Sequence, residues 1–316
     1  MRQLARFIPH LVVLIFATWC AYALRGDLAQ VSLIPVLRAW DLIAVAAVFS
    51  LVNYVLRIVR WRSYLGRLGH PLGFRFAALT FIAGFAYTLS PGKVGEMVRA
   101  RYYLPLGVPL AKTAAAFFAE RLMDLFAMVV LAALLFAGSP QYRGAILGAA
   151  GLVVATLVVF ALVPWNRVTA LLGTVDRLPA ILRKALMGIS SALGATKPLL
   201  RPAPLALGFA LALVAWGLEG AGLNVLVGIL PGAHLDLPTA VGVYSVAVLV
   251  GGLSFLPGGL GSTEAVMTAL LVTHGFSVGD SLLLTLACRL VTLWLAVCLG
   301  WIAVLVLRQR LLVVAS

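Results

Sequence analysis

Charged residues, cysteines and histidines are all scarce in this chain, and their scarcity argues against several classes of protein. Only 11% of the 316 residues are charged, and the chain has three cysteines and four histidines. Cys20, Cys288 and Cys298 lie far apart in apolar segments, which argues against a zinc or iron–sulfur site. We therefore expect neither a metal nor another cofactor.

Motifs of soluble enzymes are also missing. The sequence contains no P-loop, no G-x-S-x-G elbow and no zinc signature. ATP-driven pumping by this chain alone is therefore not expected, and we interpret the protein as a non-enzyme.

Hydrophobic residues are what the chain has in abundance. They make up 63% of the sequence, and they form several runs of about 20 residues, the length that crosses a bilayer. This composition predicts an all-α, polytopic membrane protein.

The basic residues predict its orientation. Lys and Arg number 24 against 10 Asp and Glu, a net charge of +14, and many of them cluster in residues 57–75 and 167–201, beside apolar spans. Such clusters mark cytoplasmic segments. We expect a multi-pass protein of the cell inner membrane with both termini cytoplasmic, and we attribute the charge to topology and anionic lipid rather than to nucleic acid.

Apolar length and loop charge together predict eight membrane segments, six of them full spans. The expected spans are Ile8–Leu24, Trp40–Val59, Thr113–Ala137, Ala145–Val163, Leu205–Leu230 and Ser281–Leu307. The other two segments are re-entrant hairpins. Leu72–Leu110 turns at Pro91-Gly92, and Pro238–Gly275 has the arms Thr239–Leu256 and Ser262–Thr273. If the first hairpin crossed the membrane once, every later span would reverse, and the basic cluster at residues 167–201 would lie outside. The positions of the basic clusters therefore favour a re-entrant hairpin.

The two hairpins carry similar motifs. Pro91, Gly92 and Gly95 match Pro257, Gly258 and Gly261 at an offset of 166, and Glu96 and Arg121 match Glu264 and Arg289 at an offset of 168. We therefore predict an inverted repeat of helix, helix, re-entrant hairpin and helix. Residues 1–143 form the first repeat, and residues 144–316 form the second, which includes a basic cytoplasmic segment, 164–203. Broken helices in matching halves are typical of transport sites.

Each Pro-Gly turn precedes a helix whose N-terminal amides face the membrane interior. Such an end attracts phosphate or carboxylate, although plain hairpin packing explains the motif equally well. Ser262 or Thr263 could cap the second of these helices.

Ten charged residues are expected at membrane depth, five of each sign: Lys93, Glu96, Arg99, Arg101, Glu120, Arg121, Asp124, Glu219, Glu264 and Arg289. They should pair or line a wet cavity. Glu120 and Asp124 lie one helical turn apart and need a cation from Arg121, Lys93 or Arg289, or a proton. A structural ion-pair lattice and a proton-coupled site both remain open, and Arg99 and Arg101 could instead reach the cytoplasmic interface.

Four strings, taken in order, resemble the flippase-like transmembrane region of the lysylphosphatidylglycerol synthase family. They are Arg57-Ile58-Val59-Arg60-Trp61-Arg62-Ser63-Tyr64-Leu65, then Pro91-Gly92-Lys93-Val94-Gly95-Glu96 with Arg99, then Glu120-Arg121-Leu122-Met123-Asp124, and Leu256-Pro257-Gly258-Gly259-Leu260-Gly261 with Glu264. The resemblance implies a lipid translocator. Because the chain ends at Ser316, soon after the last expected helix, we expect no aminoacyl-transferase part.

The expected function is movement of a phospholipid or isoprenoid-phosphate head group between leaflets. The alternatives are an integral membrane enzyme that uses Glu120 and Asp124 as acid and base, and an accessory subunit of a cell-envelope lipid synthase. Membrane lipids are the expected partners, and such a synthase is a second candidate partner. The expected substrate-binding residues are Pro91, Gly92, Lys93, Gly95, Glu96, Arg99, Glu120, Arg121, Asp124, Pro257, Gly258, Gly259, Gly261, Glu264 and Arg289. Among them the cations would bind phosphate, and the carboxylates would bind a cationic head-group portion or a coupling proton.

Overall fold

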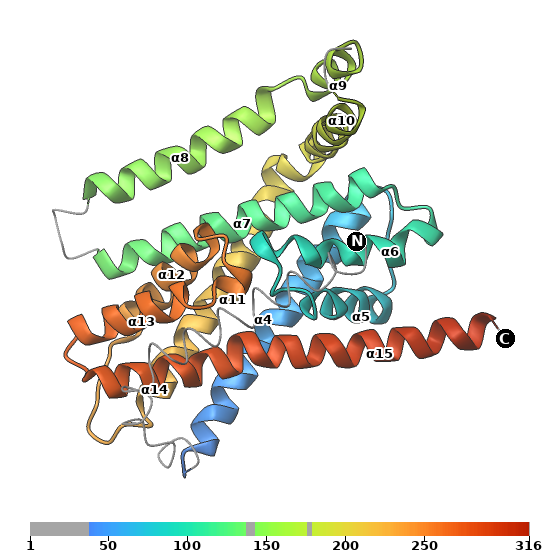
Figure 1. Cartoon of the computed structure of the whole chain (residues 1–316). Helices are drawn as coiled ribbons and strands as arrows, with labels where there is room; N and C mark the ends of the chain where they lie inside the picture. The colour runs from blue at the N-terminus through green and yellow to red at the C-terminus, as the bar shows by residue number, and fades with distance from the viewer. Residues whose placement is uncertain (1–37, 137–142, 176–178, 316) are drawn as a thin grey trace.

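The computed structural model describes residues 38–136, 143–175 and 179–315. Over these ranges the protein is helical and contains no strand, as the sequence predicts (Figure 1). The first expected span, Ile8–Leu24, and Cys20 lie outside the described residues.

The helix α4 covers Trp40–Arg67 and is longer than predicted. No glycine or proline interrupts the sequence between residues 40 and 65, so the helix continues past the expected end at Val59 and through the first basic cluster. Arg57 and Arg60 are consequently buried within the protein, with 6% and 1% of their surface exposed. Their assignment to a charged cluster flanking the span was wrong.

The first hairpin follows α4. It consists of α5 (Phe74–Phe85), the 3₁₀ segment η1 (Pro91–Val98), α6 (Arg99–Tyr103) and the short turn η2 (Leu104–Leu106). The chain reverses at Pro91-Gly92, where Gly92 has φ 59° and ψ 16°, a left-handed conformation that suits glycine. Both η1 and α6 then pack against α5.

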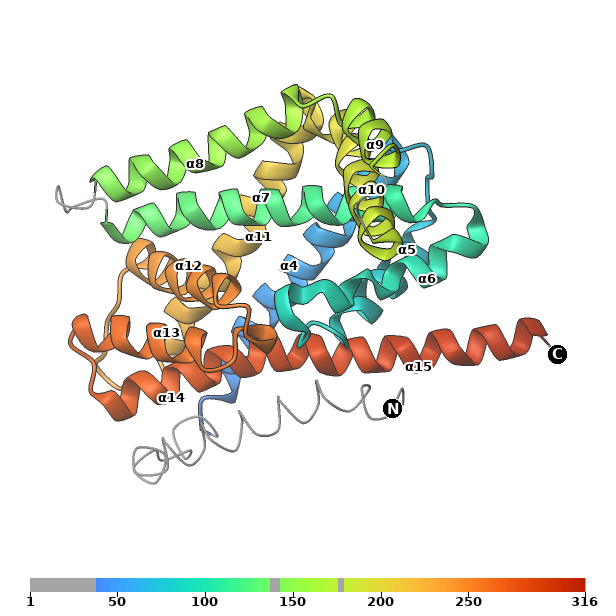
Figure 2. The same cartoon turned by 45° about the horizontal axis from the view of Figure 1, so that its top comes forward.

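The middle of the chain contains α7 (Leu110–Phe136) and α8 (Arg143–Leu162), followed by the basic segment. That segment forms α9 (Trp165–Gly173), α10 (Ala180–Ala195) and η4 (Lys197–Leu200). The two short helices pack against each other, and α10 also packs against α7 (Figure 2).

The last third contains α11 (Pro202–Val227) and the second hairpin, made of α12 (Leu237–Leu253), η5 (Pro257–Gly259) and α13 (Ser262–Thr273). Asp236 caps α12 by accepting a hydrogen bond from the Thr239 backbone amide at 3.1 Å. Hydrogen bonds from the side chain and backbone of Thr239 keep the pKa of Asp236 below its usual value. The chain then runs through α14 (Val278–Arg289), the π-helical turn η6 (Leu290–Trp294) and α15 (Leu295–Ala315).

Three helical stretches of the described chain are long and apolar enough to cross a membrane: Trp40–Arg67, Pro202–Val227 and Val278–Gln309. A fourth is reached if Leu147–Phe160 and Trp165–Gly173, bent by 65°, form one span. Of the five expected spans that lie in the described residues, length and composition therefore identify three, or four if the bent pair is one span. The helix α7 has 27 residues, but Glu120, Arg121 and Asp124 fall within every stretch of it long enough to cross. Its charges set it apart from an ordinary apolar span.

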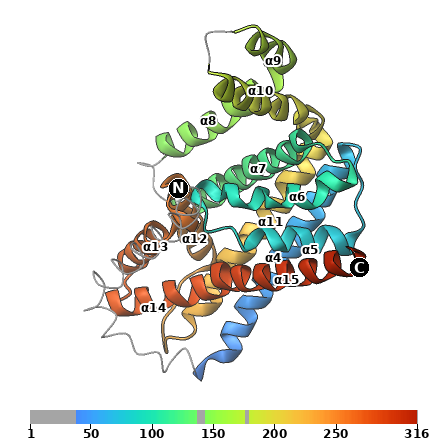
Figure 3. The same cartoon turned by 45° about the vertical axis from the view of Figure 1, so that its right-hand side comes forward.

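The core lies where α4 and α11 run side by side and cross α7 and the consecutive helices α14 and α15, as Figure 3 shows from a second direction. Aromatic side chains fill the space between α4 and the first hairpin. Trp61 and Phe81 are fully buried with ring centroids 6.0 Å apart, and the Trp61 indole N–H donates to the Tyr103 hydroxyl at 3.0 Å. This packing fixes the first hairpin against α4 and so positions the charged residues of both.

Candidate functional site

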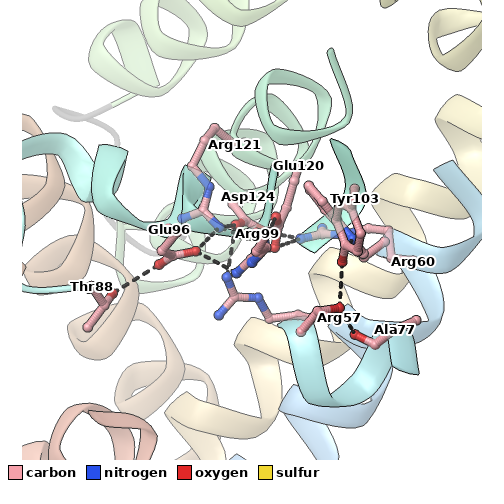
Figure 4. Close-up of polar contacts among 12 residues, drawn as sticks. Arg57, Arg60, Ala77, Thr88, Glu96, Arg99, Tyr103, Glu120, Arg121 and Asp124 are labelled. Atoms are coloured by element: carbon pink, nitrogen blue, oxygen red, sulfur yellow. Dashed lines mark hydrogen bonds and ion pairs between the residues drawn. The ribbon is translucent and has the colours of Figure 1, made fainter. Parts of the chain in front are cut away.

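A buried cluster of seven charged side chains joins α4, the first hairpin and α7 (Figure 4). Its members are Arg57, Arg60, Glu96, Arg99, Glu120, Arg121 and Asp124. Because four are arginines and three are carboxylates, the cluster retains one formal positive charge.

The carboxylates of α7 are held by arginines of other elements. Glu120 Oε1 lies 3.1 Å from Arg57 Nη2, and Glu120 Oε2 lies 3.1 Å from Arg99 Nη1. Asp124 Oδ1 accepts a hydrogen bond from Arg60 Nη2 at 2.6 Å. Burial of Glu120, which has no exposed surface, is tolerable only because charged donors replace the water it loses.

The cations expected from the sequence beside these carboxylates are Arg121, Lys93 and Arg289. Arg121 does lie beside them, with Nη2 3.2 Å from Glu120 Oε1 and 3.4 Å from Asp124 Oδ2. Lys93 and Arg289 form no ion pair with either carboxylate in the described structure. Arg57 and Arg60 were missed as partners, although their three-residue spacing on an uninterrupted helix places both on one face.

Glu96 links the first hairpin to the cluster. It accepts hydrogen bonds from Arg99 Nη2 at 2.8 Å and from the Thr88 hydroxyl at 3.0 Å, and it lies 3.5 Å from Arg121 Nη2. Arg99 is only 1% exposed, and its guanidinium carbon lies 3.9 Å from the centroid of the Phe81 ring. The alternative that Arg99 reaches the interface was therefore wrong, whereas Arg101 is exposed.

The second hairpin has an ion pair of the same kind. Arg289 Nε lies 2.6 Å from Glu264 Oε1, and Arg289 Nη2 donates to the Gly258 carbonyl at 2.8 Å. In each half, the hairpin glutamate thus pairs with an arginine of a later helix, Glu96 with Arg121 and Glu264 with Arg289. These are the residues that the sequence motifs match.

The two turns also share their backbone conformation. Gly258 has φ 62° and ψ 13°, close to the values of Gly92, and both glycines follow a proline preceded by an extended residue. Gly259 and Lys93, which match at the same offset, both have positive φ, 67° and 56°. Lys93 therefore adopts a conformation that costs a non-glycine residue about 1–3 kcal/mol.

One backbone amide at each turn, that of Gly95 and that of Gly261, already has a side-chain partner. Gly95 N–H donates to Ser90 Oγ at 2.6 Å, and Gly261 N–H donates to Glu264 Oε2 at 2.6 Å. The expectation that Ser262 or Thr263 caps α13 was wrong. The side chain of Glu264 caps the N-terminus of α13 instead, and its negative charge also complements the helix dipole. Phosphate binding by these amides is correspondingly disfavoured.

A cavity of about 320 Å³ lies where the two turns meet. Its walls come from both turns and from α4, α7, α11, α12 and α14. The turns approach closely enough that a Cβ added to Gly258 would lie 2.7 Å from Leu89 Cδ2, and one added to Gly92 would lie 3.8 Å from the Phe255 ring. The cavity is therefore shared by the two halves of the chain.

Six charged side chains line this cavity: Arg57, Lys93, Arg121, Asp124, Glu219 and Arg289. Within the described residues, Lys93 and Glu219 are the two that form no ion pair. Lys93 Nζ lies 5.7 Å from the centroid of the Trp216 ring, and Glu219 Oε2 accepts a hydrogen bond from Ser50 Oγ at 2.8 Å. Glu219 was expected at membrane depth but not in the site, because no motif surrounds it on the apolar helix α11.

The predicted site residues separate into three groups. Gly92, Lys93, Arg121, Asp124, Gly258, Gly259 and Arg289 line the cavity. Glu96, Arg99, Glu120 and Glu264 lie behind it in ion pairs. Pro91, Gly95, Pro257 and Gly261 shape the turns.

Comparison with known proteins agrees with the membrane character of the chain. The family model described as the lysylphosphatidylglycerol synthase TM region matches residues 8–300. A relative called UPF0104 membrane protein, from Methanothermobacter thermautotrophicus, is 29% identical over 284 residues, which cover 83% of this chain and 82% of the relative. The protein is therefore a membrane protein that belongs to the family of the lysylphosphatidylglycerol synthase transmembrane region.

Proposed function

We propose that this protein moves a lipid with an anionic head group, a phospholipid or an isoprenoid phosphate, between the leaflets of the cell inner membrane. The head group would enter the cavity between the two Pro-Gly turns while the acyl chains remain in the bilayer. Membrane lipids are then the partners of the protein, and translocation involves no chemical step.

The observation that carries this proposal is the surplus of positive charge at the cavity. The ion-pair cluster keeps one formal positive charge, and Lys93 adds another without an ion pair in the described structure. Glu219 offsets one of these two charges when it is ionised, so the cavity keeps a net positive charge. Arg121 and Lys93 both line the cavity, and 22% of the Arg121 side chain is exposed. Guanidinium and ammonium donors of this kind suit a phosphate group.

The matched turns favour transport over a static role. In this proposal the halves form an inverted repeat with six full spans, the hairpins enter from opposite sides, and both termini are cytoplasmic. The shared conformation of Gly92 and Gly258 and the paired Glu–Arg contacts support such a repeat. Rocking of one half against the other would then expose the cavity to each leaflet in turn.

The enzyme alternative is weaker because its candidate acid and base are occupied. Glu120 contacts Arg57 and Arg99, and Asp124 accepts a hydrogen bond from Arg60. Carboxylates held by several arginines are poor proton donors and acceptors. The role of an accessory subunit of a cell-envelope lipid synthase gives no reason for a charged cavity between the turns.

The proposal is tested by reconstitution into phosphatidylcholine vesicles with fluorescent lipids that carry different head groups. Exchange between leaflets should be faster than in empty vesicles for anionic lipids, and Lys93→Gln should slow it about tenfold, the cost of one lost charge-assisted contact. Lys184→Gln, on the exposed face of α10, is the matched control and should have no effect. If no lipid in the panel moves faster than in empty vesicles, the proposal is wrong.

A further inference from the structure

Glu219 differs from the other carboxylates near the cavity. It projects from α11 into the cavity wall and is only 3% exposed, yet no arginine, lysine or histidine of the described chain lies within ion-pair distance of it. The hydrogen bond from Ser50 Oγ is the contact that holds it. The four carboxylates that the sequence singled out, Glu96, Glu120, Asp124 and Glu264, are all paired with arginines.

An ionised carboxylate in this position is costly. Removal from water is expensive unless a cation or several donors take the place of the solvent, and one hydroxyl supplies a single donor. Binding of a proton removes the charge, and the neutral acid can still bond to Ser50. The cavity gives Glu219 a route by which water can deliver that proton.

The groups around Glu219 do not neutralise it permanently. Tyr54 and Arg57 of α4, Lys93 of η1 and Tyr244 of α12 line the same cavity, and these groups and Cys288 of α14 lie near enough to interact with the charge of Glu219. Arg57 is engaged with Glu120, while Lys93 lies over Trp216. Elsewhere in the cavity wall, α7 contributes the paired Arg121 and Asp124, and Arg289 is paired with Glu264.

We infer that Glu219 binds a proton when the cavity takes up an anionic head group, so that the proton and the phosphate cross together. This inference rests on the function proposed above. The carboxylate and one proton from water form the neutral acid, and the reverse step releases the proton on the opposite side. With Glu219 neutral, the charge of Lys93 is available to the phosphate, and by linkage each ligand strengthens the binding of the other.

Protonation can be measured without a lipid substrate. Infrared difference spectra of the protein in phosphatidylcholine nanodiscs, recorded across the pH range in which it stays folded, should show the carbonyl stretch of a carboxylic acid. The component of that band that comes from Glu219 should be absent in Glu219→Gln, displaced in Glu219→Asp, and unchanged in the control Asp41→Asn, which removes an exposed carboxylate at the start of α4. If Glu219→Gln titrates like the wild type, the inference is wrong.

Coupling is measured in vesicles that contain fluorescent phosphatidylglycerol and carry an imposed pH gradient. The wild type and Asp41→Asn should transfer the lipid at a rate that depends on the sign of the gradient, and Glu219→Gln should lose this dependence. Glu219→Asp should retain it, which would exclude a purely structural effect of the substitution. Equal gradient dependence in the wild type and Glu219→Gln, with transport intact, would overturn this inference alone. Absence of transport by the wild type across the whole lipid panel would overturn the proposed function and the coupling with it.

Discussion

Single residues in the first hairpin determine how closely its parts can approach one another and the cavity. Gly84 of α5 lies against the guanidinium group of Arg99, which is itself fixed by Glu96 and Glu120. Lys93 occupies a left-handed position that its counterpart in the second hairpin fills with glycine. Gly84 is constrained by packing. Lys93 keeps a side chain despite the strain of its backbone, as residues at functional sites often do.

We expect Gly84→Ala to destabilise the protein. A Cβ at this position would lie 2.5 Å from Arg99 Nε, and the guanidinium group cannot move without breaking its ion pairs. The expected loss is about 1–3 kcal/mol, the usual cost of overpacking. The matched control is Gly188→Ala in α10, where a Cβ would meet no atom within 4 Å. Thermal unfolding in detergent should show a lower midpoint for Gly84→Ala and an equal or higher one for the control. Equal midpoints for both variants would contradict the contact.

Lys93→Gly should separate function from folding. Glycine removes a backbone strain of about 1–3 kcal/mol. It also removes the contact with Trp216, about 0.5–1 kcal/mol, and adds unfolded-state entropy of similar size. The variant should therefore unfold at or above the temperature of the wild type while it transfers lipid more slowly. Slow transfer accompanied by a clear loss of stability would instead assign Lys93 a structural role.

At the scale of the elements, local chemistry explains what the sequence could predict. Proline removes a backbone donor and glycine accepts the left-handed conformation, so both hairpin turns could be placed from residues 91–92 and 257–258 alone. The end of α4 could not be placed, because the charge rule assigns arginines to the interface and does not foresee partners on α7. Arg57 and Arg60 meet Glu120 and Asp124 only after α4 packs beside α7, more than 60 positions along the chain.

The two hairpins are expected to enter the membrane from opposite sides. On a background without reactive cysteine, Leu106→Cys at the open end of the first hairpin should react with a membrane-impermeant maleimide from the cytoplasmic side. His274→Cys at the open end of the second hairpin should react from the outside. Both side chains are exposed, so accessibility does not limit either reaction. Labelling of both from one side would contradict opposed hairpins.

For the whole molecule, the unpaired charges of the cavity are the feature that no sequence pattern revealed. Ten charges at membrane depth could be listed from the sequence, and most of them pair as expected. Which ones stay unpaired depends on how the two turns and α11 surround one cavity, which brings Lys93 and Glu219 to it from positions 126 residues apart. The family and a polar site near the two turns could likewise be predicted from four short strings, whereas the place of Glu219 in that site could not.

The most direct test is the exchange of an anionic fluorescent phospholipid between the leaflets of vesicles that contain the wild type, Lys93→Gln or Lys184→Gln. If the lipid moves through the charged cavity, exchange should be rapid for the wild type and Lys184→Gln and about tenfold slower for Lys93→Gln. Equal rates for all three proteins, or a wild-type rate no faster than that of empty vesicles, would contradict transport of the lipid through this cavity.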